Sequence, residues 1–160
     1  MIKIFFIIII FLFQTFPSYS NLNEKGVICK YIKCSQNYLE NIDRYKTKNG
    51  LSDIGFRFSQ NTVVGYEFYK YNDDILFRKR IGYGNYTTTT ESIIWSNDFY
   101  KLNRKTLILQ IYGKLNGNIV VADIRQCRVY LNAKSFDNGL NILKDKYQNE
   151  FNKQLKDNKI

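Results

Sequence analysis

The sequence predicts a mainly β protein: an antiparallel barrel or sandwich of about seven or eight short strands with one C-terminal amphipathic α-helix. From residue 26 to about residue 130, short runs of aromatic and β-branched residues are separated by Asn, Asp, Gly and Ser, which is typical of strands joined by turns. After Ser135 the apolar residues recur every three or four positions, as in a helix with one buried face. A closed barrel is preferred over a sandwich, because closure removes the exposed edges that aromatic strands would otherwise leave.

The strand candidates follow one another with a turn signal between neighbours. They cover residues 53–58, 63–71, 75–80, 86–90, 92–95, 106–112 and 118–130. Asn72, Asp73 and Asp74 mark a hairpin turn that leads into a basic return strand. Gly82 and Gly84 indicate a bulge or a tight bend, and the Asn116-Gly117 pair suits a turn with positive φ.

The C-terminal helix is expected over residues 136–157, packed on a β domain that covers residues 21–135. Its apolar stripe consists of Leu140, Leu143, Tyr147, Phe151 and Leu155. Asp137 is the predicted N-cap. A stripe of this spacing also occurs on membrane-surface and partner-binding helices, but core packing is the preferred interpretation.

Residues 1–20 have the three regions of a secretory signal peptide: a charged start with Lys3, an apolar run over residues 4–13, and a polar end at Ser18-Tyr19-Ser20. The apolar run is too short to span a hydrocarbon core, which needs about twenty residues. We therefore expect cleavage after Ser20 and an exported protein, either periplasmic or extracellular. The formal net charge is +10, or +9 once Lys3 is removed, and a surface of one dominant sign attracts polyanions.

The chain contains three cysteines, Cys29, Cys34 and Cys127. Cysteines near the two ends of an exported domain usually pair, so we expect a Cys29–Cys127 disulfide that ties the first strand to the last, which closure of the barrel would make neighbours. Cys34 is then a free thiol, or it joins two chains. A Cys34–Cys127 disulfide remains an alternative, whereas Cys29 and Cys34 lie on opposite faces of one continuous strand.

The residue types exclude several common chemistries. The chain has no histidine, which excludes Ser-His and Cys-His nucleophile pairs and the usual zinc and iron sites. No phosphate-binding or dinucleotide-binding glycine motif is present. We therefore expect no catalytic residues, no metal and no cofactor; carboxylate chemistry using Glu67, Glu91, Asp73 or Asp74 is a lower alternative.

One surface of the predicted hairpin has the composition of a binding face. Arg78, Lys79 and Arg80 lie on a strand beside Tyr69, Tyr71 and Tyr83. Such a basic aromatic face can stack bases or sugars and follow phosphates. An ordinary solvated strand with cross-strand pairs is the alternative, and the favoured one.

Several short motifs in the second half of the chain resemble one group of proteins. Trp95, the Leu102-Asn103-Arg104 turn before Thr106 and Leu109, and the Gln126-Cys127-Arg128 segment are similar to motifs in small exported proteins of unknown function from AT-rich marine alphaproteobacteria of the SAR11 type and their phages. Cys29 corresponds to the early cysteine of that pattern and Cys127 to the late one. This chain departs from the pattern because it has no cysteine between residues 34 and 127, and Cys34 has no counterpart. The resemblance implies the β architecture and carries no known activity.

The sequence therefore predicts a small exported, non-enzymatic β domain that acts as a binding or envelope-associated accessory protein. A barrel of about eight strands can enclose a small apolar ligand or be filled by its own side chains. The alternative is a basic interaction module for polyanions such as nucleic acid or lipopolysaccharide.

Overall fold

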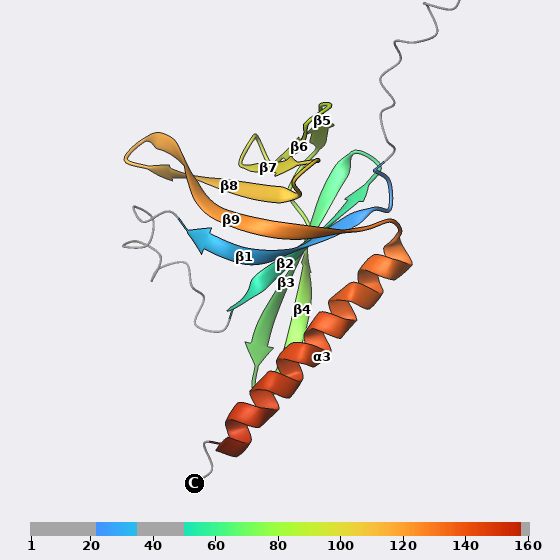
Figure 1. Cartoon of the computed structure of the whole chain (residues 1–160), viewed down its shortest axis with the longest axis vertical. Coiled ribbons are helices and arrows are strands. Elements are labelled where there is room, and N and C mark those ends of the chain that lie inside the picture. Colours follow the sequence, from blue (N-terminus) through green and yellow to red (C-terminus); the bar gives the residue numbers. More distant parts are fainter. Residues whose placement is uncertain (1–21, 35–49, 158–160) are drawn as a thin grey trace, which may run out of the picture.

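The computed structural model describes residues 22–34 and 50–157 (Figure 1). The expected signal peptide, residues 1–20, lies outside the described residues. Within the described residues, nine strands form one sheet and one helix follows. The elements are β1 (Gly26–Cys34), β2 (Gly50–Ser59), β3 (Thr62–Tyr71), β4 (Asp74–Arg80), β5 (Tyr86–Thr88), β6 (Ser92–Trp95), β7 (Tyr100–Asn103), β8 (Ile108–Leu115), β9 (Asn118–Tyr130) and α3 (Ala133–Asp157).

The strands are ordered β4-β3-β2-β1-β9-β8-β7-β6-β5, and all neighbours are antiparallel. The mainly β class with a terminal helix is confirmed, but the strand count is nine and the sheet is not closed, so the preferred barrel is not confirmed. The sheet coils instead: strands β2–β4 run steeply across the direction of β8 and β9 (Figure 1). One isolated bridge, Thr62 to Asn85, brings the start of β3 to the chain just before β5.

The turns lie close to where the sequence predicts them. A two-residue turn, Asn72 (φ 53°) and Asp73, joins β3 to β4; Asp74, which was predicted to lie in this turn, begins β4 and pairs with Tyr71. Asn116 and Gly117, at φ 50° and 83°, join β8 to β9. Gly82 and Gly84 both have positive φ and form the bend that takes the chain out of β4.

Alternation along the strands builds two apolar clusters on the two faces of the sheet. The inner cluster, inside the coil of the sheet, contains Phe56, Phe58, Trp95, Leu102 and Leu109. The outer cluster joins strands β1 and β3 to α3 through Ile28, Tyr66, Phe68, Phe136 and Leu140. Figure 1 shows α3 leaving the end of β9 and turning back across the sheet toward β4.

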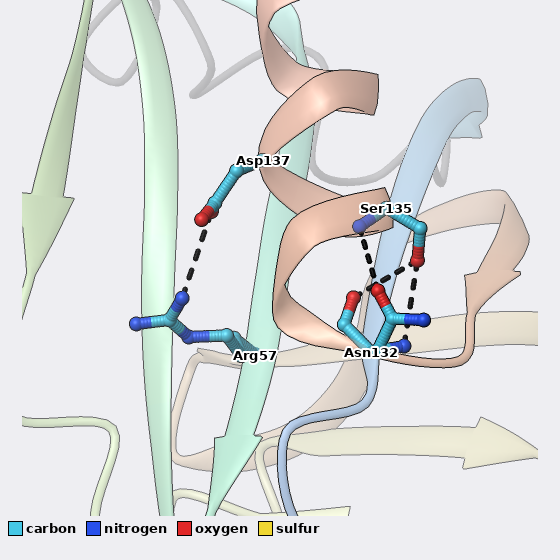
Figure 2. Close-up of polar contacts among 4 residues, drawn as sticks. All are labelled: Arg57, Asn132, Ser135 and Asp137. Atoms are coloured by element: carbon cyan, nitrogen blue, oxygen red, sulfur yellow. Dashed lines mark hydrogen bonds and ion pairs between the residues drawn. The ribbon is translucent and has the colours of Figure 1, made fainter.

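The helix begins at Ala133, and the predicted N-cap was wrong. Asn132 is the N-cap, because its Oδ1 accepts a hydrogen bond from the Ser135 backbone N–H at 2.8 Å (Figure 2). The Ser135 hydroxyl donates in turn to the Asn132 carbonyl at 2.9 Å. Asp137 lies beyond the first turn of the helix, and its carboxylate is 3.6 Å from the Arg57 guanidinium (Figure 2).

Four of the five residues of the predicted helix stripe, all except Leu155, contact the sheet or the helix–sheet core. Leu140 and Leu143 are buried, Tyr147 packs edge-on against Phe68, and Lys70 lies 3.8 Å above the Phe151 ring. The stripe also includes Phe136, which is fully buried. A side chain at Gly26 would overlap the Phe136 ring, and one at Gly55 would come within 3.1 Å of it, so two glycines allow α3 to approach the sheet closely.

Candidate functional site

The predicted basic aromatic face is split between the two sides of the β3–β4 hairpin. Register places Arg80 opposite Gly65, Lys79 opposite Tyr66 and Arg78 opposite Glu67. Because side chains alternate along a strand, Arg78 and Arg80 share the inner side of the sheet, whereas Lys79 lies on the side that faces α3.

The tyrosines of this face meet the arginines only in part. The Arg78 guanidinium lies 5.7 Å from the centre of the Tyr69 ring. Tyr83 covers Gly65, where a Cβ would clash with its ring, and its hydroxyl donates to Glu67 over 3.5 Å. Tyr71 is 61 % exposed next to the hairpin turn. The use of this surface to stack bases or sugars stays a prediction.

Glu67 changes the electrostatics of this surface. Its carboxylate is 3.1 Å from Arg78 and 2.9 Å from Arg80. Two of the three cations in the predicted triplet therefore share one acid, which lowers the net positive charge of this surface and weakens its attraction for phosphates. The sequence contained a signal for this contact, because a two-residue turn at residues 72–73 sets the register that puts Glu67 opposite Arg78.

Next to Glu67, two tyrosine hydroxyls form a half-buried polar contact. Tyr83 and Tyr100 are hydrogen-bonded to each other, and their rings meet edge-on with centroids 5.3 Å apart. Burial raises the pKa of both hydroxyls above its usual range, and the Glu67 charge adds to this effect. Both hydroxyls therefore stay protonated at neutral pH.

A second ion pair lies close to Tyr100. Arg125 binds Asp123 through Nε at 2.8 Å and through a terminal nitrogen at 2.5 Å, and both side chains are less than one-fifth exposed. Burial raises the pKa of the Asp123 carboxyl, and the neighbouring Arg125 opposes that shift. Each of these two acids, Glu67 and Asp123, has arginine as its partner, which favours a structural role for this polar network.

The inner face of the sheet is filled by its own side chains. Phe56 lies with its ring centre 5.1–5.5 Å from those of Tyr83, Trp95 and Tyr100. Trp95 and Tyr100 are stacked at 5.4 Å. This packing fills the middle of the inner face, and the hollow found beside it, next to Phe58 and Leu102, has a volume of only about 180 Å³.

The carboxylates singled out from the sequence lie in separate places. Asp73 and Asp74 are at the β3–β4 turn, and Glu91 is exposed in the turn between β5 and β6. Glu67 is four residues along β3 from the partner of Asp74, or about 13 Å at the usual rise of a strand. These positions do not bring two of the predicted acids together as a catalytic pair.

Cys29 and Cys127 form a disulfide, with an S–S distance of 2.01 Å. They are directly opposite each other in the β1–β9 pairing, and both are buried. The predicted pairing is therefore present, and the alternative Cys34–Cys127 bond is wrong because Cys127 is already occupied. Cys34 ends β1 opposite Asp123, and no other cysteine remains in the chain to pair with it. A disulfide of this kind fits an oxidising compartment.

The Leu-Asn-Arg motif has a structural role. Leu102 is buried in the inner cluster. Asn103 Oδ1 accepts hydrogen bonds from the backbone of Lys105 at 3.0 Å and Thr106 at 2.8 Å, which holds the turn into β8. Arg104 Nη1 donates to the Thr89 carbonyl at 2.9 Å and so ties this turn to the β5–β6 turn.

A groove on the outer surface lies where α3 meets β1 and β9. It has a volume of about 370 Å³. Its apolar walls come from Ile28 and Tyr130 on the sheet and from Ile142 and Leu143 on the helix. Gly139 shapes it, because a Cβ there would lie 2.6 Å from the Tyr130 ring. Ile142 is 62 % exposed, so solvent or a ligand in the groove can reach its side chain.

Three cations line the same groove: Lys30 from β1, Arg128 from β9 and Lys146 from α3. None of the described residues that line it is acidic. The Arg128 guanidinium lies 5.9 Å from the centre of the Tyr130 ring. Lys146 approaches Glu150 at 3.6 Å, but both groups are more than half exposed, so this pair is weak. The groove therefore combines apolar walls with a positively charged rim.

Two other hollows are less suited to a charged ligand. One, of about 180 Å³, has mainly apolar walls that include Leu22, Phe58 and Leu131; its charged lining residues are Lys25 and Arg104, and Arg104 already donates to the Thr89 carbonyl. The other, of about 400 Å³, includes both Asp98 and Lys101, so its charges cancel. The groove beside α3 has about twice the volume of the first hollow and three lining cations instead of two, and it lacks the acidic residue of the second hollow.

Within residues 22–34 and 50–157, no group of three or more His, Cys, Asp or Glu side chains is placed to hold a metal ion. In the same part of the chain, no helix is both long enough and apolar enough to cross a membrane. Comparisons with protein-family models, with curated proteins and with solved structures find no match for this chain.

Proposed function

We propose that this protein is an exported, non-enzymatic binding domain that holds an anionic amphiphile in the groove between α3, β1 and β9. The observation that carries the proposal is the composition of that groove: apolar walls from both the sheet and the helix, three cations and no acidic lining residue. The placement in the periplasm or outside the cell follows from the signal-like residues 1–20 and from the resemblance to small exported SAR11-type proteins.

The chemistry of the groove matches the two parts of such a ligand. An alkyl chain against Ile28, Ile142 and Leu143 gains about 0.8 kcal/mol for each buried CH₂ group. A carboxylate, sulfate or phosphate at the rim is attracted by Lys30, Arg128 and Lys146, an interaction that salt screens because the rim is open to solvent. A volume of about 370 Å³ lies at the lower end of the range for ligand pockets, which suits a single short alkyl chain.

The direct test is titration of the oxidised chain, residues 21–160, with 11-(dansylamino)undecanoic acid, followed by dansyl fluorescence. Replacing the rim cations by glutamate (Lys30→Glu, Arg128→Glu, Lys146→Glu) is expected to weaken binding at least about tenfold. The matched control makes the same change of net charge at three exposed lysines outside the groove, Lys105→Glu, Lys114→Glu and Lys153→Glu, and is expected to alter binding less than about twofold.

Two further measurements separate the parts of the proposal. The methyl ester of the same probe, which has no charge, should bind the native chain and the rim variant alike. Ile142→Ser should weaken both probes, because it removes part of the apolar wall. Equal loss in the rim variant and in its control would show attraction to net charge alone and would reject the groove as the site.

A polyanion-binding module is the second candidate, and the net charge is the observation that favours it. Its expected surface is the Arg78 and Arg80 side of the hairpin, where Glu67 already binds both arginines. Salt-dependent retention on immobilised heparin that disappears in the Arg78→Glu, Arg80→Glu variant would support this candidate. Retention unchanged by these substitutions would exclude that surface.

A further inference from the structure

Strand β4 is an edge of the sheet, and α3 covers only its beginning. Among the described strands, β4 pairs with β3 on one side and with no strand on the other. The Gln148 side chain of α3 binds this outer edge at two points: its Oε1 accepts from the Ile75 backbone N–H at 2.7 Å, and its Nε2 donates to the Asp73 carbonyl at 2.8 Å. A carboxamide has the donor and acceptor of a peptide group, so Gln148 occupies the place that the backbone of a neighbouring strand would take.

The Gln148 contact shows which backbone groups of β4 point outward. In an antiparallel pair, alternate residues direct both N–H and C=O toward the partner, and the residues between them direct both groups away. Since Asp73 and Ile75 point outward, Phe77 and Lys79 do so as well. Leu76 and Arg78 point inward and belong to the ladder with β3. The outward groups of Phe77 and Lys79 are therefore oriented to receive another strand.

The side chains along this stretch indicate the charge of a partner. Arg78, Lys79 and Arg80 are consecutive and exposed, and they project to both faces of the edge. Ile81, which follows them, is 84 % exposed. A second copy paired edge to edge would place the same three cations against one another, which is unfavourable. An extended segment rich in Asp and Glu would instead find Lys79 on one face and, on the other, Arg78 and Arg80, whose positive charge Glu67 balances only in part.

We infer that the β4 edge over residues 76–80 is a docking site for an acidic, extended segment of another protein, which adds to the sheet as a further strand. Backbone hydrogen bonds to Phe77 and Lys79 supply the attachment, and the three cations select the charge. This site is separate from the groove beside α3, since β2 and β3 lie between β4 and the nearest strand of that groove, β1.

The test uses the oxidised chain, residues 21–160, and a fluorescein-labelled seven-residue peptide of alternating Glu and Thr, with a Lys-Thr peptide as the opposite charge. The decisive pair of variants is Lys79→Pro and Lys79→Ala. Both remove the same charge, but only proline removes the outward N–H, and it does so without breaking a bond of the β3 ladder. Fluorescence anisotropy should show the Glu-Thr peptide bound by the native and Lys79→Ala chains, at least about tenfold weaker binding by Lys79→Pro, and no binding of the Lys-Thr peptide.

Amide hydrogen exchange of the native chain gives a second readout that does not depend on a variant folding. Saturation with the Glu-Thr peptide should slow exchange at Phe77 and Lys79, whose N–H groups point outward, and leave Leu76 and Arg78, already in the ladder, unchanged. Equal binding by the proline and alanine variants, or binding without new protection at Phe77 and Lys79, would overturn strand addition. So would a concentration-dependent dimer that protects the same two amides in the absence of peptide.

Discussion

Because Phe136 closely contacts Gly26, we expect the effect of Gly26→Ala on stability to change sign when Phe136 is replaced by alanine. Phe136 is fully buried between α3 and the sheet, so Phe136→Ala should lower the free energy of unfolding by about 3–5 kcal/mol. Gly26→Ala places a methyl group inside the Phe136 ring and should cost about 1–3 kcal/mol through overpacking.

In the double variant the ring is gone, and the cost of Gly26→Ala should disappear. Gly26 does not have positive φ, so alanine fits its backbone and restricts the unfolded chain, which stabilises by about 0.4–1 kcal/mol. Gly26→Ala should therefore be destabilising in the native background and neutral or stabilising in Phe136→Ala. The two effects should differ by at least about 1 kcal/mol, as expected for residues in contact.

Urea unfolding of the oxidised protein, followed by far-ultraviolet circular dichroism and by Trp95 fluorescence, gives the free energy of unfolding of the native protein, the two single variants and the double variant. Gly65→Ala is the control, because its added Cβ meets Tyr83 on the other face of the sheet and not Phe136. Its cost should be the same with and without Phe136. If Gly26→Ala changes the free energy of unfolding by the same amount in both backgrounds, the contact between Phe136 and Gly26 is not the cause of the cost.

Three further effects follow from single contacts. Asn132→Ala should cost about 1 kcal/mol through loss of the N-cap, and Asp137→Ala less than half as much, because the Asp137 side chain is 54 % exposed and its contact with Arg57 is long, at 3.6 Å. Urea midpoints compare the two variants, and a larger loss at Asp137 would restore it as the cap. The Cys29–Cys127 bond closes a loop with a sequence separation of 98, so its reduction should lower the free energy of unfolding by up to about 4.7 kcal/mol. Urea titrations with and without dithiothreitol measure this loss, and an unchanged midpoint would contradict the prediction. Burial raises the pKa of the Tyr83 hydroxyl above its usual 10.0, so the unfolded chain loses this proton at a lower pH than the folded chain, and the free energy of unfolding should fall as pH rises above about 10. Urea midpoints measured at increasing pH should fall less steeply for Tyr83→Phe than for the native protein. An equally steep fall in both proteins would assign the effect to other groups.

Local patterns in the sequence were enough to predict most of the strands, the helix and several of the turns between them. The Asn116-Gly117 and Asn72 turns, the bend at Gly82 and the apolar stripe of α3 depend on conformational preferences within a few residues. The helix start was less well determined, since Asn132 and Asp137 are both good capping residues. Asn132 is the N-cap because a helix that starts after it packs Phe136 against the sheet and allows Asn132 to hydrogen-bond with Ser135.

The disulfide was predicted through an idea that was only partly right. The sequence argument placed Cys29 and Cys127 together because a closed barrel makes its first and last strands neighbours. In the structure β1 and β9 are neighbours at the centre of an open sheet, and the ends of the sheet are β4 and β5 instead. The pairing of two cysteines constrains one strand contact and leaves the others undetermined.

The sequence by itself therefore determined the mainly β class, the terminal helix, the hairpin turns and the excess of positive charge, because each depends on composition or on neighbours along the chain. Only the tertiary structure decided which charges act together. Glu67 balances Arg78 and Arg80 through strand register, whereas Lys30, Arg128 and Lys146 meet in one groove although they come from β1, β9 and α3. The physical reason is that strand order and helix placement are set by long-range packing, such as Phe136 on Gly26, and no local pattern specifies which distant residues that packing brings together.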